Sequence, residues 1–261
     1  YMPYYNGAMQ LREVVQYFNS LLPLEEVARS DYSMNGLQVG ELDAEVSKAA
    51  FAVDACMASF ERAAQSGAQL LCVHHGLFWG QPLAITGEHY RRIKYLLDHG
   101  LALYAAHLPL DMEPELGNNA GLADLLKLQD RQPFGDYHGV KIGVKGELPA
   151  EAHIEEVLRM LGITRESALG VLPFGTDTIK TVGVISGGAD KEVGQALAEG
   201  LDLYITGELN HQVYHTCLEG GINLISAGHY NTEVFGVQNL MEKIHTDKGL
   251  EVQFIDVPTG L

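Results

Sequence analysis

The sequence is poor in cysteine, in basic residues and in long apolar runs, and each shortage argues against a class of protein. The three cysteines, Cys56, Cys72 and Cys217, lie far apart without a C-x-x-C pair, which argues against a disulfide framework and a thiolate zinc site. Lys and Arg number 17 against 34 Asp and Glu, and the net charge of −17 repels phosphate backbones and anionic lipid. We therefore expect neither nucleic acid nor a membrane as a partner.

The lack of apolar runs also bears on location. No segment approaches the roughly 18 consecutive apolar residues of a membrane-spanning helix. No basic stretch followed by an apolar one marks a secretory signal peptide. We therefore expect a cytoplasmic protein. An anionic small molecule is compatible with this acidic chain only where a local positive charge, such as a metal ion, attracts it.

Helical and strand patterns alternate along the 261 residues, a length that suits one large domain or two small ones. Helices are predicted over 9–23 (stopped by Pro23), 57–67, 89–100, 118–128, 150–161, 191–200, 210–220 and 232–245. Strands are predicted over 47–55, 68–73, 101–107, 140–148, 181–188, 201–206, 222–227 and 250–257. This alternation indicates an α/β fold with largely parallel sheets.

The second half of the chain resembles the first. The strand, helix and strand that begin near Lys48 align at a nearly constant offset with those that begin near Lys180. The fold class predicted is α/β, with two similar Rossmann-like domains that arose by internal duplication, although any two βαβ units look alike. The polar segment 130–139 predicts a boundary, so we assign 1–127 plus 228–261 to a first α/β domain and 128–227 to a second.

Histidines and carboxylates cluster at the predicted carboxyl ends of strands, where ligands bind in open α/β sheets. They are His74 and His75, the pair His107 and Asp111, and the pair His229 and Glu233. Imidazoles with carboxylates and no thiolate suit zinc, iron, manganese or nickel. His74 and His75 would face opposite sides of a regular strand. At a strand end followed by Gly76, however, both rings can face one cavity and serve two metals about 3.5–4 Å apart.

The two spaced pairs share the pattern His-x-x-x-carboxylate. Around Glu233 the sequence predicts a helix start, where residues four apart lie on one face and the helix dipole favours the ionised carboxylate. Pro109 makes the stretch from His107 to Asp111 a predicted loop, and its geometry stays open.

Other segments have an ordinary structural interpretation beside a functional one. Asp54 either orients a ligand histidine or caps the next helix. His211 and His215 lie four apart on one predicted helix and imitate a metal pair, with Glu208 nearby, so this group is expected either behind the ligands or facing substrate. Asn35-Gly36 indicates a turn. The stretch 186–190, SGGAD, is better explained as a tight turn than as a phosphate loop, because it lacks G-x-G-x-x-G and G-K-[ST].

Five separated motifs, in order and spacing, resemble the NIF-three-like family of dinuclear metal centre proteins, the GTP cyclohydrolase 1 type 2 homologues. The motifs are MNGLQVG, VHHGLFW, HLPLD, TGELNHQVYH and GHYNTE, and the resemblance runs from Met9 almost to the end of the chain. It implies two α/β domains with two divalent metals, zinc, iron or manganese, in a cleft between them. It also implies a homohexamer.

The resemblance assigns metal ligands residue by residue. It implies His74 and His75 as ligands, one for each metal, together with Asp111, His229 and a bridging Glu233. His107 lies close to the metals in this pattern. The chain lacks the cysteine ligands of single-zinc cyclohydrolases, so those enzymes are a poor guide to it.

Two functions fit these residues. The first is a metal-dependent hydrolase, in which two metals lower the pKa of a shared water toward about 7 for attack on a nucleotide-like molecule such as GTP. There His107 would act as a proton shuttle, while Glu208 and His211 would face substrate. The second is a metal carrier or a regulatory protein that binds a protein partner. Vacant coordination positions favour the hydrolase.

Overall fold

The computed structural model describes residues 8–261 and has a mixed α/β fold, as predicted. The chain divides into a first unit, Tyr1–Leu110 with Gly236–Val257, and a second unit, Asp111–Phe235 with Pro258–Leu261. Residues 1–7 of the predicted first domain lie outside the described residues. The bounds differ from those expected, because the helix α6 (Asn118–Leu125) packs on strands of the second unit.

The sheet of the first unit has the strand order β13-β4-β5-β6-β2. Its strands are β2 (Gly36–Val39), β4 (Lys48–Asp54), β5 (Leu70–His75), β6 (Ala102–Ala105) and β13 (Glu251–Phe254). Strands β13, β4, β5 and β6 run parallel, and β2 pairs with β6 in the antiparallel sense. A small antiparallel pair, β1 (Met9–Gln10) with β3 (Glu45–Val46), completes the strands of this unit.

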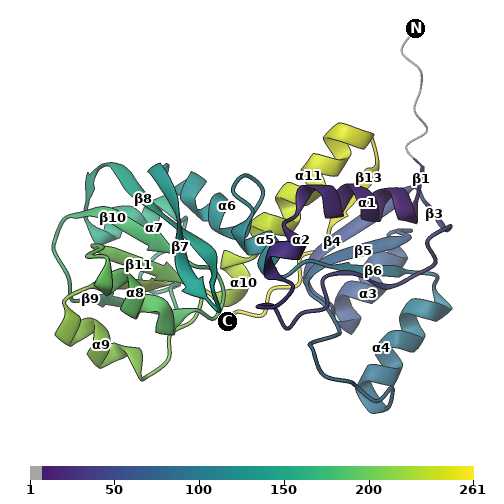
Figure 1. The fold of residues 1–261 in the computed structure, drawn as a ribbon, viewed down its shortest axis with the longest axis horizontal. Helices are drawn as coiled ribbons and strands as arrows, with labels where there is room; N and C mark the ends of the chain where they lie inside the picture. The colour runs from purple at the N-terminus through teal and green to yellow at the C-terminus, as the bar shows by residue number, and fades with distance from the viewer. Residues whose placement is uncertain (1–7) are drawn as a thin grey trace, which may run out of the picture. The chain divides into compact units, whose positions relative to one another are not determined.

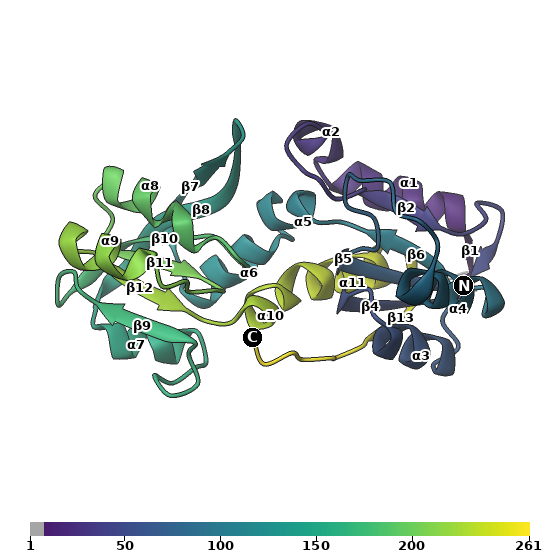
Figure 2. The ribbon, with the colours of Figure 1, turned by 90° about the horizontal axis from the view of Figure 1, so that it is seen from below.

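Helices cover both faces of this sheet (Figures 1 and 2). They are α1 (Leu11–Leu21), α2 (Leu24–Val27), α3 (Met57–Gln65), α4 (Gly87–Asp98) and, from Gly236 on, α11 (Val234–Lys248). Alternate residues of β4 point to opposite faces. Ala50 joins the core beneath α3 and α4, whereas the Phe51 ring meets Phe18 of α1 edge-on at 6.1 Å. Both faces are apolar, as expected for parallel strands under helices.

The sheet of the second unit has the order β7-β8-β10-β11-β12-β9. Its strands are β7 (Gln129–Tyr137), β8 (Val140–Ala152), β9 (Gly170–Pro173), β10 (Ile179–Val184), β11 (Leu203–Thr206) and β12 (Asn223–Ser226). Its helices are α6, α7 (Ile154–Met160), α8 (Val193–Ala198), α9 (Val213–Gly220) and α10 (His229–Thr232), with a 3-10 turn at Asp190–Glu192. Apolar residues of α6 and α7 form a core with β10, β11 and β12.

Both units contain three consecutive parallel strands with an antiparallel neighbour that comes earlier in the chain. In the first unit these are β4, β5 and β6 with β2, and in the second they are β10, β11 and β12 with β9. This shared strand order agrees with the predicted duplication, which stays a prediction.

The structure corrects three details of the sequence interpretation. The segment 130–139, predicted as a boundary, forms most of strand β7 and pairs with β8. The predicted loop around Pro109 is a short helix, α5 (Leu108–Met112). Proline suits a first helical turn because the amide there has no partner inside the helix. Gly36, predicted as part of a turn, begins strand β2 with a φ of +104°.

All three cysteines are free thiols, in agreement with the absence of a disulfide framework. Among the helices of residues 8–261, none is both long and apolar enough to cross a lipid bilayer.

Candidate metal centre

The first unit brings together three histidines at the carboxyl ends of β5 and β6. His74 and His75 end β5, and His107 follows β6 two residues later. One nitrogen from each of the three rings lies within 4.8 Å of the others, a spacing that could hold a metal ion. The ring centroids of His74 and His75 are 4.6 Å apart, although consecutive strand residues usually point to opposite faces. The two rings therefore lie close enough for one nitrogen of each to approach the same point.

Each of these rings is held through its Nδ1 atom. His74 Nδ1 donates to the Ala106 carbonyl at 2.9 Å, and His75 Nδ1 lies 2.9 Å from Asp54 Oδ1. His107 Nδ1 lies 2.8 Å from Asp31 Oδ1. An acceptor at Nδ1 fixes the proton there and leaves the Nε2 lone pair for a metal. Asp54 therefore orients His75, and the N-cap of the next helix is Cys56 instead.

Asp31 and Asn35 complete the surroundings of His107, and sequence reasoning missed both. Asp31 Oδ2 accepts from Asn35 Nδ2 at 2.8 Å, and Asn35 Oδ1 accepts from the His107 amide at 2.7 Å. Burial raises the pKa of Asp31, but the hydrogen bonds and charge of His107, with bonds from Asn35 and Ser33, outweigh it and lower the pKa. Asp31 therefore stays ionised and keeps the His107 proton on Nδ1. The motif MNGLQVG was the available signal for Asn35, whereas Asp31 lies outside it.

Gly76 allows the turn after His75. A Cβ at this position would lie 2.3 Å from Gln38 Nε2 and 2.7 Å from Ala105 Cβ. Gln38 Oε1 in turn accepts from the Leu77 amide at 2.8 Å. Only glycine lets the chain pass this closely over β2 and β6.

The second unit holds His229 between two carboxylates. His229 Nδ1 lies 2.6 Å from Glu208 Oε1, and its Nε2 lies 3.1 Å from Glu233 Oε2. His229 begins α10 and Glu233 follows its last residue, so the predicted i, i+4 contact is made. Burial lowers the pKa of His229, but hydrogen bonds and charge from Glu233 and Glu208 overcome this and raise the pKa to about 9.

Backbone of glycine residues lies against Glu233 and Glu208, the two carboxylates that contact His229. Gly187, in the predicted tight turn after β10, has a φ of +64°, and a Cβ there would lie 2.2 Å from Glu233 Oε1. Its carbonyl accepts from the Gly207 and Glu208 amides at 2.9 and 3.1 Å. The backbone of these turns thus shapes the space that Glu233 fills.

Asp111 belongs to the same unit and is oriented by neutral donors. Its Oδ1 accepts from Asn118 Nδ2 at 2.8 Å and from Ser186 Oγ at 2.9 Å. One carboxylate oxygen is thus oriented by amide and hydroxyl groups, an arrangement typical of metal-binding carboxylates.

His211 and His215, which imitate a metal pair in the sequence, do not lie on one helix. His211 precedes α9 in a turn and is exposed, whereas His215 lies within the helix and its ring contacts Tyr214 at 5.3 Å. Glu208 lies behind His229 instead, in the position that Asp54 has behind His75.

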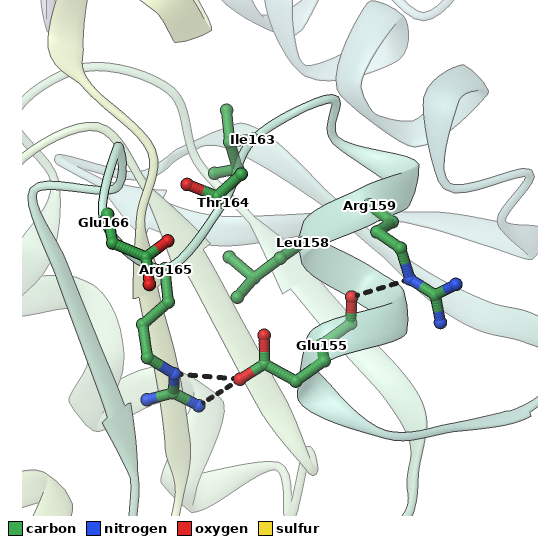
Figure 3. A pocket seen from close by; sticks show the side chains of 7 residues that line it. All are labelled: Glu155, Leu158, Arg159, Ile163, Thr164, Arg165 and Glu166. Atoms are coloured by element: carbon green, nitrogen blue, oxygen red, sulfur yellow. Dashed lines mark hydrogen bonds and ion pairs between the residues drawn. The ribbon is translucent and has the colours of Figure 1, made fainter.

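A pocket of about 270 Å³ opens elsewhere in the second unit, beside α7 (Figure 3). It contains none of the predicted site residues. Arg165 in its wall is bound to the Glu155 carboxylate at 2.6 Å, and Arg159 Nε donates to the Glu155 carbonyl at 3.3 Å. Both arginines of this pocket thus bind Glu155.

Comparisons with known proteins agree along the whole chain. The family described as Duf34/NIF3 (NGG1p interacting factor 3) matches residues 9–260. A Deinococcus radiodurans protein is 46% identical over 256 residues, which cover 98% of this chain and 96% of that protein. A Treponema pallidum protein is 40% identical over 286 residues, covering 97% and 100%. Both are named GTP cyclohydrolase 1 type 2 homolog.

Solved structures show the same fold. The protein TTHA1606 from Thermus thermophilus is 38% identical, with a TM-score of 0.86, covering 97% of this chain and 100% of that one. The protein ybgI, described as of unknown function, is 34% identical with the same TM-score and coverage.

Proposed function

Because the chain belongs to the DUF34/NIF3 family, we propose that it binds two divalent metal ions and is a metal-dependent hydrolase of a nucleotide-like small molecule. The observation that carries the proposal is the way the histidines are held: each is bound at Nδ1, by a carboxylate or a carbonyl. Fixed in this way, His74 and His75 present the Nε2 lone pair to a metal. His229 would do so once the Nε2 proton that faces Glu233 in the metal-free protein is released.

The donor chemistry fits zinc, iron or manganese. Imidazoles with carboxylates and no thiolate suit these ions. We propose that His74 and His75 of the first unit, and Asp111, His229 and Glu233 of the second unit, would hold the metals. The names of the relatives, GTP cyclohydrolase 1 type 2 homolog, support GTP as the first substrate to test.

His107 is the proposed proton shuttle. Bound divalent metals would lower the pKa of a coordinated water toward about 7 and so supply a nucleophile at neutral pH. Asp31 holds the Nδ1 proton of His107, and Nε2 is then the basic nitrogen that accepts a proton. The same division of roles, an aspartate orienting a histidine base, occurs in hydrolytic triads.

Turnover and metal content, measured on one sample, test the proposal. We expect metal-loaded protein to open the GTP ring and a chelator to abolish this activity. His107→Ala should lower the rate by about 10²–10⁴-fold, the usual contribution of a positioned base, and keep the metal. Elemental analysis and absorbance assays measure both. Two metals without turnover would contradict the hydrolase.

The metal-free protein should show the effect of His229 on stability. A pKa of about 9, above the ordinary 6.5, stabilises the fold fully below pH 6.5, and this stabilisation is lost as the pH rises through 9. We expect the difference in unfolding free energy between wild type and His229→Gln, in chelator, to shrink by up to about 3 kcal/mol over this range. Denaturant titrations from pH 6 to 10 measure it. Glu208→Gln should move the transition to lower pH, and an unchanged midpoint would contradict the assigned cause.

A non-catalytic metal carrier or regulatory protein is the second candidate. The family description, NGG1p interacting factor 3, names an interaction with another protein and favours this candidate. Fast transfer of metal to a competing chelator, together with no turnover, would support it.

A further inference from the structure

The three-histidine group has an aromatic neighbour in the same unit. The Trp79 ring centroid lies 5.0 Å from that of His107, with the rings nearly perpendicular, and 6.0 Å from that of His75. Trp79 is the one tryptophan of the 261-residue chain. Despite its size and apolar character, it is 37% exposed.

Hydrogen bonds hold the Trp79 ring in place. Its indole Nε1 donates to the Gly76 carbonyl at 3.0 Å, directly after His75. Backbone pairing of Trp79 with Ser33, and a 2.9 Å bond from the Met34 amide to the Phe78 carbonyl, tie this loop to the segment that carries Asp31. The ring is therefore oriented before any ligand arrives, which reduces the entropy cost of binding.

Tyr32 adds a second exposed aromatic side chain, beside Gly80, which directly follows Trp79. Its side chain packs against Gly80, where an added Cβ would lie 3.4 Å from Tyr32 Cδ1, and Tyr32 is 66% exposed. Two exposed aromatic side chains thus lie on adjoining backbone segments. One segment follows His75 in the chain, and the other contains Asp31, which binds His107. Oriented aromatic surface of this kind is typical of binding sites rather than of ordinary protein surface.

We propose that Trp79 stacks against a planar purine base and so positions the substrate next to His75 and His107. This inference rests on the proposed function and specifies its substrate class. The chain carries a net charge of −17, which opposes phosphate groups, whereas stacking on an aromatic ring is independent of that charge. Trp79 is thus assigned as a positioning residue that recognises the base.

Binding at Trp79 can be followed by tryptophan fluorescence, because the chain has a single tryptophan. The protein is first saturated with metal, so that any effect of the metal on emission is already complete. Guanosine, GTP and inorganic tripolyphosphate are then titrated separately. We expect guanosine and GTP to change the emission of Trp79 and tripolyphosphate to leave it unchanged. A response to tripolyphosphate equal to that of GTP would overturn the proposal.

Variants separate stacking from structural support. By calorimetry, Trp79→Leu should bind GTP about 5-fold to 150-fold more weakly than wild type and keep its metal, and Trp79→Phe should recover most of the affinity. Tyr90→Leu, which removes an exposed ring from α4, should bind GTP as wild type does. Unchanged GTP affinity in Trp79→Leu, or loss of metal in it, would overturn the proposal.

The two proposals can fail separately. Base-dependent quenching without turnover would contradict the hydrolase and leave the stacking role intact. Turnover with the same KM in Trp79→Leu and wild type would contradict stacking and leave the hydrolase intact.

Discussion

Replacing His75 with alanine is expected to reduce the metal content from about two ions per chain to one or fewer. The reason is that His75, as a proposed ligand, would donate through Nε2 from a ring that Asp54 holds at Nδ1, so the variant removes one oriented donor. The fold should persist, because His75 is the last residue of β5 and its side chain is not part of the apolar core. The cost in unfolding free energy should stay near the ~1 kcal/mol of a single hydrogen bond.

Two further variants sharpen this test. Asp54→Asn keeps the size of the side chain and removes its charge, and loss of such an orienting partner typically weakens metal binding about 10-fold to 100-fold. His99→Ala is the matched control, since His99 is an exposed histidine that stacks on Tyr95 at 3.9 Å. Elemental analysis after dialysis measures metal content, and circular dichroism checks the fold. Full metal in His75→Ala would remove His75 from the site.

Local sequence patterns were sufficient for the elements whose residues bury one or both faces. Helix α1 was predicted because its apolar residues repeat at helix spacing, and strand β4 because it is a short continuous apolar run. Strand β7 was missed because most of its side chains are exposed and Pro133 and Gly135 interrupt it. Such a strand is specified by its pairing with β8, and that pairing does not show in the local pattern.

Some residues of the candidate site could likewise be predicted from the local sequence, and others could not. Adjacent His74 and His75 at a strand end carried a chemical signal that could be read locally. Asp31 carried none, because it meets His107 across 76 positions of sequence. The difference between a helix and a loop at Pro109 was also beyond the local pattern, since proline is compatible with both. Ligand types could therefore be predicted, whereas the partners that orient them required the fold.

Gly187→Ala is expected to reduce the stability of the second unit and to displace Glu233, a proposed metal ligand. A φ of +64° costs a non-glycine residue about 1–2 kcal/mol. The new Cβ would lie 2.2 Å from Glu233 Oε1 and 3.1 Å from His229 Nε2. The backbone cannot retreat, because the Gly187 amide donates to Thr232 Oγ1 at 3.0 Å. Glu233 must move instead, and overpacking of this kind adds about 1–3 kcal/mol.

Gly162→Ala is the control variant that has the backbone cost without the steric contact, so the difference between the two variants measures the contact. Gly162 has a similar φ of +73°, but an added Cβ would meet nothing within 4 Å. We expect Gly162→Ala to lose only the backbone cost of about 1–2 kcal/mol and to retain its metal. Gly187→Ala should lose more stability and bind metal at least ~10-fold more weakly, a factor that corresponds to about 1.4 kcal/mol. Thermal unfolding and metal titration measure both. Equal losses in the two variants, with metal affinity unchanged, would show that contact with Gly187 does not position Glu233 as a ligand.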